Sequence, residues 1–156
     1  MAENQRLGAL LEAFIGQISP ARGRALSFLA AASVTGSQAI LLHYALADPD
    51  STPSTLAAQL SLSLPAVSQM IERLVRLQLL KRAEDPADRR RRTLAVTPRA
   101  RRLLGALQAV RAAEFAAGTA RLPKATQREL IALLSRAVDE LKLGGSRLRQ
   151  DSDDSG

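Results

Sequence analysis

Apolar residues recur every three or four positions along most of the chain, and this spacing constrains its fold more than any other feature. A stripe of this kind lets a helix bury one face and expose the other. The stripes consist of Leu7, Leu10, Leu11, Phe14, Ile15 and Ile18, then Ile40, Leu41, Tyr44 and Ala45, then Leu56 and Leu60, then Val67, Met70, Ile71, Leu74 and Leu77, then Leu103, Leu104, Leu107 and Val110, and finally Leu130, Leu133, Leu134, Val138 and Leu141. The sequence therefore predicts a mainly α-helical protein.

Signals for helix ends fall between the stripes. A hydroxyl residue before proline offers an N-cap oxygen, and proline suits the first helical position because its missing N–H has no partner there. This pattern occurs at Ser19-Pro20, Thr52-Pro53 and Thr97-Pro98, and capping-box spacing occurs at Thr35–Gln38 and Thr126–Glu129. Gly144-Gly145 is expected to end the last helix, which leaves residues 146–156 as a disordered tail.

One stretch breaks the helical spacing. Glu84 to Asp88 has the Asp and Pro content of a turn, and Thr93 to Val96 carries β-branched residues at two positions. Between them stand four consecutive arginines, 89–92, which repel one another unless an anion meets them. The sequence predicts a small β-wing of two or three strands with arginines at its tip.

Composition limits the possible functions. The formal net charge is +7 over 156 residues, and the sequence pI is about 11.1, so a basic surface points to nucleic acid first and to an acidic membrane second. The chain has no cysteine, which excludes a disulfide framework, a thiolate zinc site and a thiol redox switch. A polar N-terminus and the lack of a long apolar run predict a cytoplasmic protein.

Two rival classes find little support. An enzyme would need a phosphate-binding glycine loop, a metal cluster or a nucleophile set, and His43 is the only histidine in the sequence. Binding to a membrane surface through residues 5–18 would depend on Arg6 alone, opposed by Glu12. We therefore expect no enzymatic activity, no metal, no cofactor and no membrane partner.

The stretch from Thr52 to Val96 has the order of a winged helix-turn-helix: a short helix, a tight connection, a second helix and the wing. The second helix, from Leu64 to about Leu77, begins with small groups that fit a major groove about 12 Å wide. Its polar face could place Ser68 and Gln69 on base edges and its arginines on phosphates. The predicted DNA-binding residues are Ser63, Pro65, Ala66, Ser68, Gln69, Arg73, Arg76, Asp88, Arg89, Arg90, Arg91 and Arg92.

An amphipathic helix with arginines on its wet face is more often a plain surface helix than a DNA reader. The charge of the neighbouring wing alters that balance. From Arg73 to Arg102 the chain places eleven of its 22 Lys and Arg residues against three acids, Glu84, Asp85 and Asp88. A polyanion explains this concentration inside a folded hairpin better than solvent does.

These segments resemble the MarR family of bacterial transcriptional regulators. Residues 85–98, DPADRRRRTLAVTP, are similar to the family's acidic-then-arginine wing and the helix start that follows it. Residues 64–74, LPAVSQMIERL, resemble its recognition helix, and Val34-Thr35 and residues 122–130 resemble the starts of two flanking helices. The resemblance covers roughly residues 6–142.

The resemblance implies a homodimer on a palindromic operator, with half-sites about 34–36 Å apart. It implies dimerisation helices at 4–34 and 124–142, a winged DNA-binding domain at 35–97 and a connecting helix at 98–120. It also implies that Arg90 enters the minor groove and that Asp88 braces a wing arginine. Strand alternation leaves open which of the four wing arginines faces DNA.

The chain departs from the family pattern at three positions. Pro20 interrupts what is normally one long first helix, so a break or kink is expected there. Gln78 stands where a glycine usually follows the recognition helix, so this turn is expected to be strained. Ala39 replaces a common aromatic residue, which suggests an effector pocket near Ala39 and His43 for a small anionic or aromatic molecule. The predicted function is a ligand-responsive repressor, and the alternative is an effector-independent architectural or constitutive DNA-binding protein, in either case acting at the nucleoid.

Overall fold

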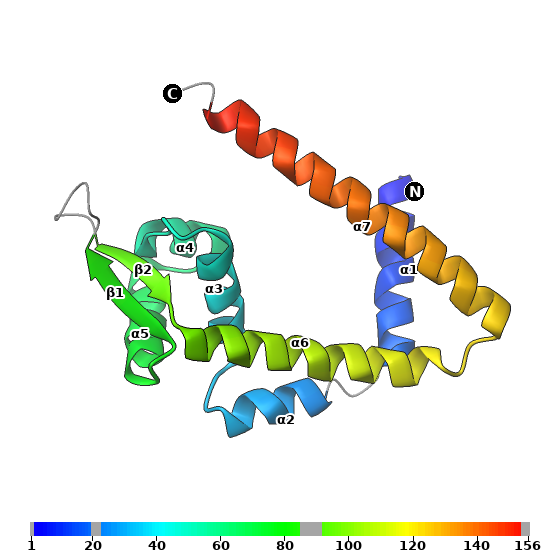
Figure 1. The fold of residues 1–156 in the computed structure, drawn as a ribbon, viewed down its shortest axis with the longest axis horizontal. Helices are drawn as coiled ribbons and strands as arrows, with labels where there is room; N and C mark the ends of the chain where they lie inside the picture. Colours follow the sequence, from blue (N-terminus) through cyan, green and yellow to red (C-terminus); the bar gives the residue numbers. More distant parts are fainter. Residues whose placement is uncertain (1, 20–22, 85–91, 154–156) are drawn as a thin grey trace. The chain divides into compact units, whose positions relative to one another are not determined.

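The computed structural model describes residues 2–19, 23–84 and 92–153 (Figure 1). Its elements are α1 (Glu3–Ile18), α2 (Gly23–Ala31), α3 (Gly36–Ala47), α4 (Pro53–Leu60), α5 (Leu64–Arg76), β1 (Leu80–Glu84), β2 (Arg92–Val96), α6 (Pro98–Thr119) and α7 (Lys124–Asp153). The predicted class, mainly α with a small β-wing, is confirmed. Two compact units make up the chain: residues 1–18 with 115–156, and residues 19–114.

The 19–114 unit is built on an aliphatic core. Leu41, Leu42, Leu56, Val67 and Leu74 are fully buried there, and α4 and α5 pack on each other and on neighbouring elements. With aromatics at only 3% of the chain, Leu, Val, Ile and Ala fill this space. The core holds α5 by its inner face and leaves its outer face to solvent.

Helix α2 belongs to this unit, whereas residues 4–34 were predicted to form one dimerisation segment. Leu29 of α2 and Val34, which follows the helix, lie in the same core as Leu41. Both side chains are at most 6% exposed, so their burial ties α2 to the winged unit. The break expected near Pro20 is consistent with α1 ending at Ile18, although Pro20 itself lies outside the described residues.

Three predicted helix starts are confirmed by their caps. Thr35 and Gln38 form a reciprocal capping box on α3, with bonds of 3.2 and 3.0 Å. Thr52 caps α4 together with Thr55, and Ser63 accepts the Ala66 N–H at the start of α5. Each cap supplies a partner for N–H groups that a helix leaves open at its first turn, a contribution of about 1 kcal/mol apiece.

Thr97 joins three elements at the base of the wing. Its hydroxyl donates to the Gln78 carbonyl at 2.8 Å, lies 3.2 Å from the Leu79 carbonyl, and accepts the Ala100 N–H at 3.2 Å. Its own backbone N–H donates to the Leu79 carbonyl at 3.1 Å. The first turn of α6, the end of β2 and the connection from α5 to β1 are thereby held together at one 6% exposed residue.

The described part of the wing is one antiparallel strand pair. Leu80 pairs with Val96 and Glu84 with Arg92, so the register is fixed over five residues on each strand. Leu80 and Leu94 face the core at 1% and 3% exposure, while Lys81 and Arg82 are exposed. On β2 the order of buried Leu94, exposed Ala95 and half-buried Val96 follows the strand period of two, whereas Arg82 of β1 is exposed although it lies on the face of Leu80.

The second unit contains α1, the end of α6 and α7. Gly118 of α6 lies so close to the backbone of Ile18 that an added Cβ would stand 2.0 Å from the Ile18 oxygen, so only glycine allows this approach. The side-chain amide of Gln127 donates to the Leu122 carbonyl at 2.8 Å and to the Thr119 carbonyl at 3.3 Å. These bonds satisfy carbonyls that the end of α6 leaves open.

Two predictions about α7 were wrong. The helix begins at Lys124, so Thr126 lies inside its first turn and does not cap it. It then continues through Gly144 and Gly145 to Asp153, where a disordered tail from residue 146 was predicted. A glycine costs a helix roughly 1 kcal/mol relative to alanine, which weakens a helix without ending it when no residue caps the break.

Within the described residues, no single helix is both long enough and apolar enough to cross a membrane. The bent pair α2 and α3, at 82°, meets those limits of length and composition only when taken together.

Gln78 adopts the left-handed conformation expected of the glycine it replaces, with φ of 58°. A side chain in that region costs about 1–2 kcal/mol. We therefore expect Gln78→Gly to raise the free energy of unfolding by about 1 kcal/mol, because the gain in the folded chain exceeds the added entropy of the unfolded one. Gln108→Gly, at an exposed position inside α6, is the matched control and should lower it by about 1 kcal/mol. Thermal unfolding at one protein concentration compares the two; equal destabilisation by both would contradict the strain at Gln78.

Candidate nucleic-acid interface

Helix α5 has two sharply different faces. Val67, Ile71 and Leu74 are buried in the core of the 19–114 unit, at 2% exposure or less. On the opposite side Gln69 and Glu72 are exposed, together with both arginines of the last turn, Arg73 and Arg76. Cations near a helix C-terminus complement its dipole, and a row of polar groups of this length can follow a groove in DNA.

The connection into α5 is tight and partly apolar. Ser61 ends α4 in the left-handed conformation, with φ of 53°, and the next residue returns its N–H to the Ala57 carbonyl at 3.0 Å. Leu62 and Leu64 then stand 42% and 47% exposed on either side of the cap residue Ser63. The start of α5 thus presents a hydroxyl flanked by two leucines to solvent.

Arg73 is held in place by the backbone before α3. Its Nη2 donates to the Ser33 carbonyl at 3.3 Å, and Ser33 itself is left-handed with φ of 58°. A guanidinium carries five N–H donors in a fixed plane, so one bond orients the group and leaves it able to bind an anion.

A groove of about 500 Å³ runs between the start of α3 and the outer face of α5. Its walls come from both helices and from the connection before α5, and the lining residues are Ser37, Gln38, Leu62, Ala66, Gln69, Met70, Glu72, Arg73 and Arg76. Four of these, Ala66, Gln69, Arg73 and Arg76, were predicted from the sequence to contact DNA. The polar residues of α3 were missed, because no helix-turn-helix pattern includes them.

The remaining predicted DNA contacts have different outcomes. Ser63 and Pro65 lie at the exposed start of α5, and Ser68 is half-buried on its side. Asp88, Arg89, Arg90 and Arg91 lie outside the described residues. Arg92 opens β2, opposite Glu84. The role of each residue stays a prediction.

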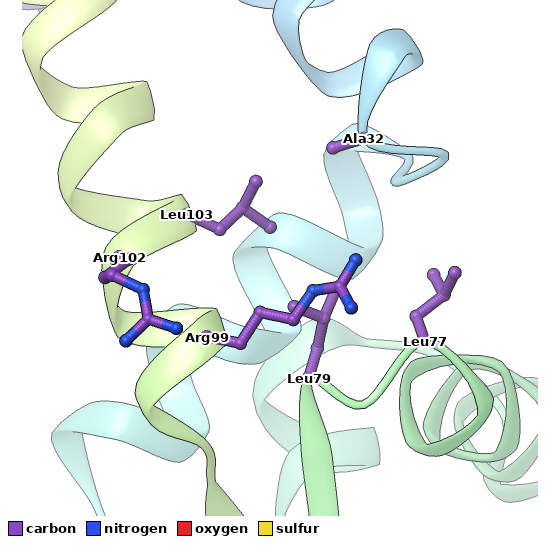
Figure 2. A pocket seen from close by; sticks show the side chains of 6 residues that line it. All are labelled: Ala32, Leu77, Leu79, Arg99, Arg102 and Leu103. Carbon is purple, nitrogen blue, oxygen red and sulfur yellow. The ribbon is translucent and has the colours of Figure 1, made fainter.

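A smaller cavity of about 280 Å³ lies at the C-terminal end of α5 (Figure 2). Leu77 and Leu79 from the connection between α5 and β1, Ala32 and Leu103 line it with aliphatic groups, and Arg99 and Arg102 come from the first turns of α6. Figure 2 shows the Arg99 side chain reaching from α6 toward Leu79 and Leu77. A cavity with an aliphatic lining and two guanidinium groups is suited to a small organic anion.

The residues predicted to line an effector pocket lie elsewhere. Ala39 is 6% exposed in the aliphatic core, and His43 is exposed on α3. Neither lines the groove or the cavity described above, so a pocket at these positions stays a prediction. Among the described residues, no three His, Asp or Glu side chains gather as metal ligands would.

Residues 32–91 match the sequence profile of the MarR family. Several solved structures share the fold at low identity. The transcriptional regulator Tm0710 from Thermotoga maritima is 20% identical, with a TM-score of 0.74, over 91% of this chain and 98% of that one. The S. aureus MepR–DNA complex is 21% identical, with a TM-score of 0.62, over 88% and 98%. S. aureus MepR bound to ethidium bromide is 20% identical, with a TM-score of 0.59, over 90% and 97%. Comparison with curated proteins found no match.

Proposed function

We propose that the protein is a sequence-specific regulator of transcription that binds double-stranded DNA as a homodimer. Two findings support this: residues 32–91 match the MarR family profile, and the chain shares the fold of a solved transcriptional regulator. The observation that carries the proposal is the outer face of α5, where Gln69, Arg73 and Arg76 are exposed on a helix fixed by its buried side. Such a helix can enter the major groove as a rigid unit. We propose repression of transcription at the nucleoid as its mode of action.

Charge supports the same assignment. The exposed cations near α5 include Arg73 and Arg76 on the helix and Lys81 and Arg82 on β1, with Glu72 as the acid among the outer residues of α5. Phosphate contacts of this kind supply most non-specific affinity and fix the position of a protein on DNA. Sequence preference then requires contacts to base edges, for which Gln69 has both a donor and an acceptor.

Unburied apolar side chains in the unit of residues 1–18 and 115–156 support a homodimer. Leu7 and Leu10 of α1 are 56% and 58% exposed, and on α7 Leu134, Val138 and Leu141 are 48%, 47% and 76% exposed at helical spacing. A contiguous exposed apolar stripe marks an interaction surface. A second copy of the chain supplies a matching stripe, as closed two-fold dimers require.

We also propose that the aliphatic cavity with Arg99 and Arg102 takes the effector of a ligand-responsive repressor. The effector class would be a small organic anion, with its charged group at the arginines and its apolar body against Leu77, Leu79 and Leu103. Leu77 caps the C-terminal end of α5, so a bound molecule would press on the recognition helix itself. Effector-independent binding as an architectural protein is the alternative, and it predicts no response to any such anion.

The assignment of base reading to Gln69 and of a charge contact in the minor groove to Arg90 is tested by salt titration. Gln69→Ala should relax the preference at one base pair per half-site, costing about 1–3 kcal/mol on the selected operator and little on scrambled DNA. Arg90→Ala should weaken binding to both duplexes and reduce the slope of log affinity against log salt by about 0.9 per lost contact. The operator comes from selection of duplexes by the purified protein. A changed salt slope for Gln69→Ala together with a pure preference change for Arg90→Ala would contradict the assignment.

The dimer surface is tested by placing a charge on the α7 stripe. Leu134→Glu should shift the protein toward monomer and lower its thermal stability in a concentration-dependent way, because the exposed stripe is buried only between subunits. Arg136→Gln changes the net charge by the same amount on the opposite side of α7 and should leave the dimer intact. Analytical ultracentrifugation measures both. An unchanged dimer in Leu134→Glu would rule out this surface.

The effector cavity is tested with hexanoate and benzoate as probes and with hexanol as the uncharged comparison. Each carboxylate should lower the affinity of the protein for its operator. In Arg99→Gln this loss should be about tenfold smaller, because a charge-assisted bond to the carboxylate is missing. Arg101→Gln removes the same charge from the same helix outside the cavity and should respond like wild type. For each protein the DNA affinity with probe is divided by the DNA affinity without probe. Comparing this ratio between wild type and the two variants cancels the direct effect of the lost charge on DNA binding. Release by hexanol as strong as by hexanoate would count against an anion site.

A further inference from the structure

We propose that the groove between α3 and α5 seats the sugar–phosphate backbone of one DNA strand, with Ser37 of α3 as a phosphate contact. The proposal rests on the proposed function, since it needs α5 to lie in a DNA groove. It adds a helix outside the helix-turn-helix to the interface and assigns a place to residues that no sequence pattern included.

The lining of the groove matches the chemistry of a nucleic-acid strand. Leu62, Ala66 and Met70 are apolar, and they suit the carbon face of a deoxyribose. Arg73 and Arg76 supply positive charge for the phosphates. Glu72 is the one acid among the lining residues, so the groove keeps an excess positive charge of one.

The position of the groove favours a strand over a free anion. Gln69 lines it and also belongs to the face of α5 that would meet base edges, so the groove opens toward the same DNA. A recognition helix in the major groove has a phosphate backbone running along each side. The wall formed by α3 lies where one of those backbones would pass.

Two features hold the contacting groups ready. Arg73 is tied to the Ser33 carbonyl at 3.3 Å, which directs its guanidinium along the wall shared with α3. Ser37 is exposed and lies between Thr35 and the 4% exposed Gln38, whose capping box fixes the first turn of α3. The Ser37 hydroxyl therefore extends from a backbone that needs no rearrangement to receive a phosphate.

The test neutralises phosphates one at a time. Operator duplexes carrying a single methylphosphonate are bound by wild type, by Ser37→Ala and by the control Ser27→Ala, which alters an exposed serine of α2 outside the groove. At one phosphate per half-site, neutralisation should lower the operator affinity of wild type and of Ser27→Ala by about tenfold. The affinity of Ser37→Ala should fall by clearly less, because this variant has already lost that contact. Elsewhere the three proteins should give the same profile.

A second variant tests the sugar contact. Leu62→Asn should lower the affinity for operator and for scrambled duplexes by the same factor, since backbone contacts carry no sequence information. If no phosphate couples to Ser37 while Gln69→Ala still relaxes base preference, the groove proposal is overturned and the proposed function stands. A change of base preference in Leu62→Asn would also overturn the groove proposal. If the wild-type protein selects no duplex at all, both the groove proposal and the proposed function are overturned.

Discussion

The hydroxyl of Thr97 is the contact on which the geometry of the winged unit depends. It donates to the Gln78 carbonyl, just after the C-cap of α5, and accepts the Ala100 N–H in the first turn of α6. The backbone of the same residue closes the wing against Leu79. One 6% exposed side chain thus sets the end of α5, the start of β1 and the start of α6 relative to one another. Because buried hydrogen bonds left unmade cost more than those formed contribute, this arrangement has few alternatives.

Helix α5 lies between residues in an unfavourable backbone conformation. In the described part of the chain the non-glycine residues with positive φ are Ser33, Ser61 and Gln78. Ser61 lies in the connection before α5 and Gln78 in the connection after it, and the Ser33 carbonyl accepts the bond from Arg73. Each sharp reversal keeps the connections short, which fixes where the outer face of α5 points. Strain of this kind persists only where surrounding contacts over-determine the backbone, as the buried core and Thr97 do here.

Helical spacing and cap residues were enough to predict most of the fold, since Thr35, Thr52 and Ser63 act as caps and the inner face of α5 was correctly identified. The strain at Gln78 followed from the resemblance to the MarR family and is seen in its φ of 58°. The failures have physical causes. Local spacing cannot tell a cap from an interior hydroxyl, as at Thr126, nor say which core will bury Leu29. Ser37 and Arg99 were missed because their neighbours in space are far away in sequence.

The groove and the cavity involve two sides of one short helix, and this has a thermodynamic consequence if both proposals hold. Arg76 lines the groove, and Leu77, the next residue, lines the cavity. A ligand changes DNA affinity only through a difference in its own affinity for the DNA-bound and free arrangements. With the C-terminal end of α5 bonded by Thr97 through Gln78, a molecule that displaces Leu77 must move Arg76 or break that bond. Bound DNA would then lower the affinity for the anion by the same factor as the bound anion lowers the affinity for DNA, because binding linkage is reciprocal. A shift of one helix end would therefore be sufficient to couple effector and operator without any rearrangement of the aliphatic core.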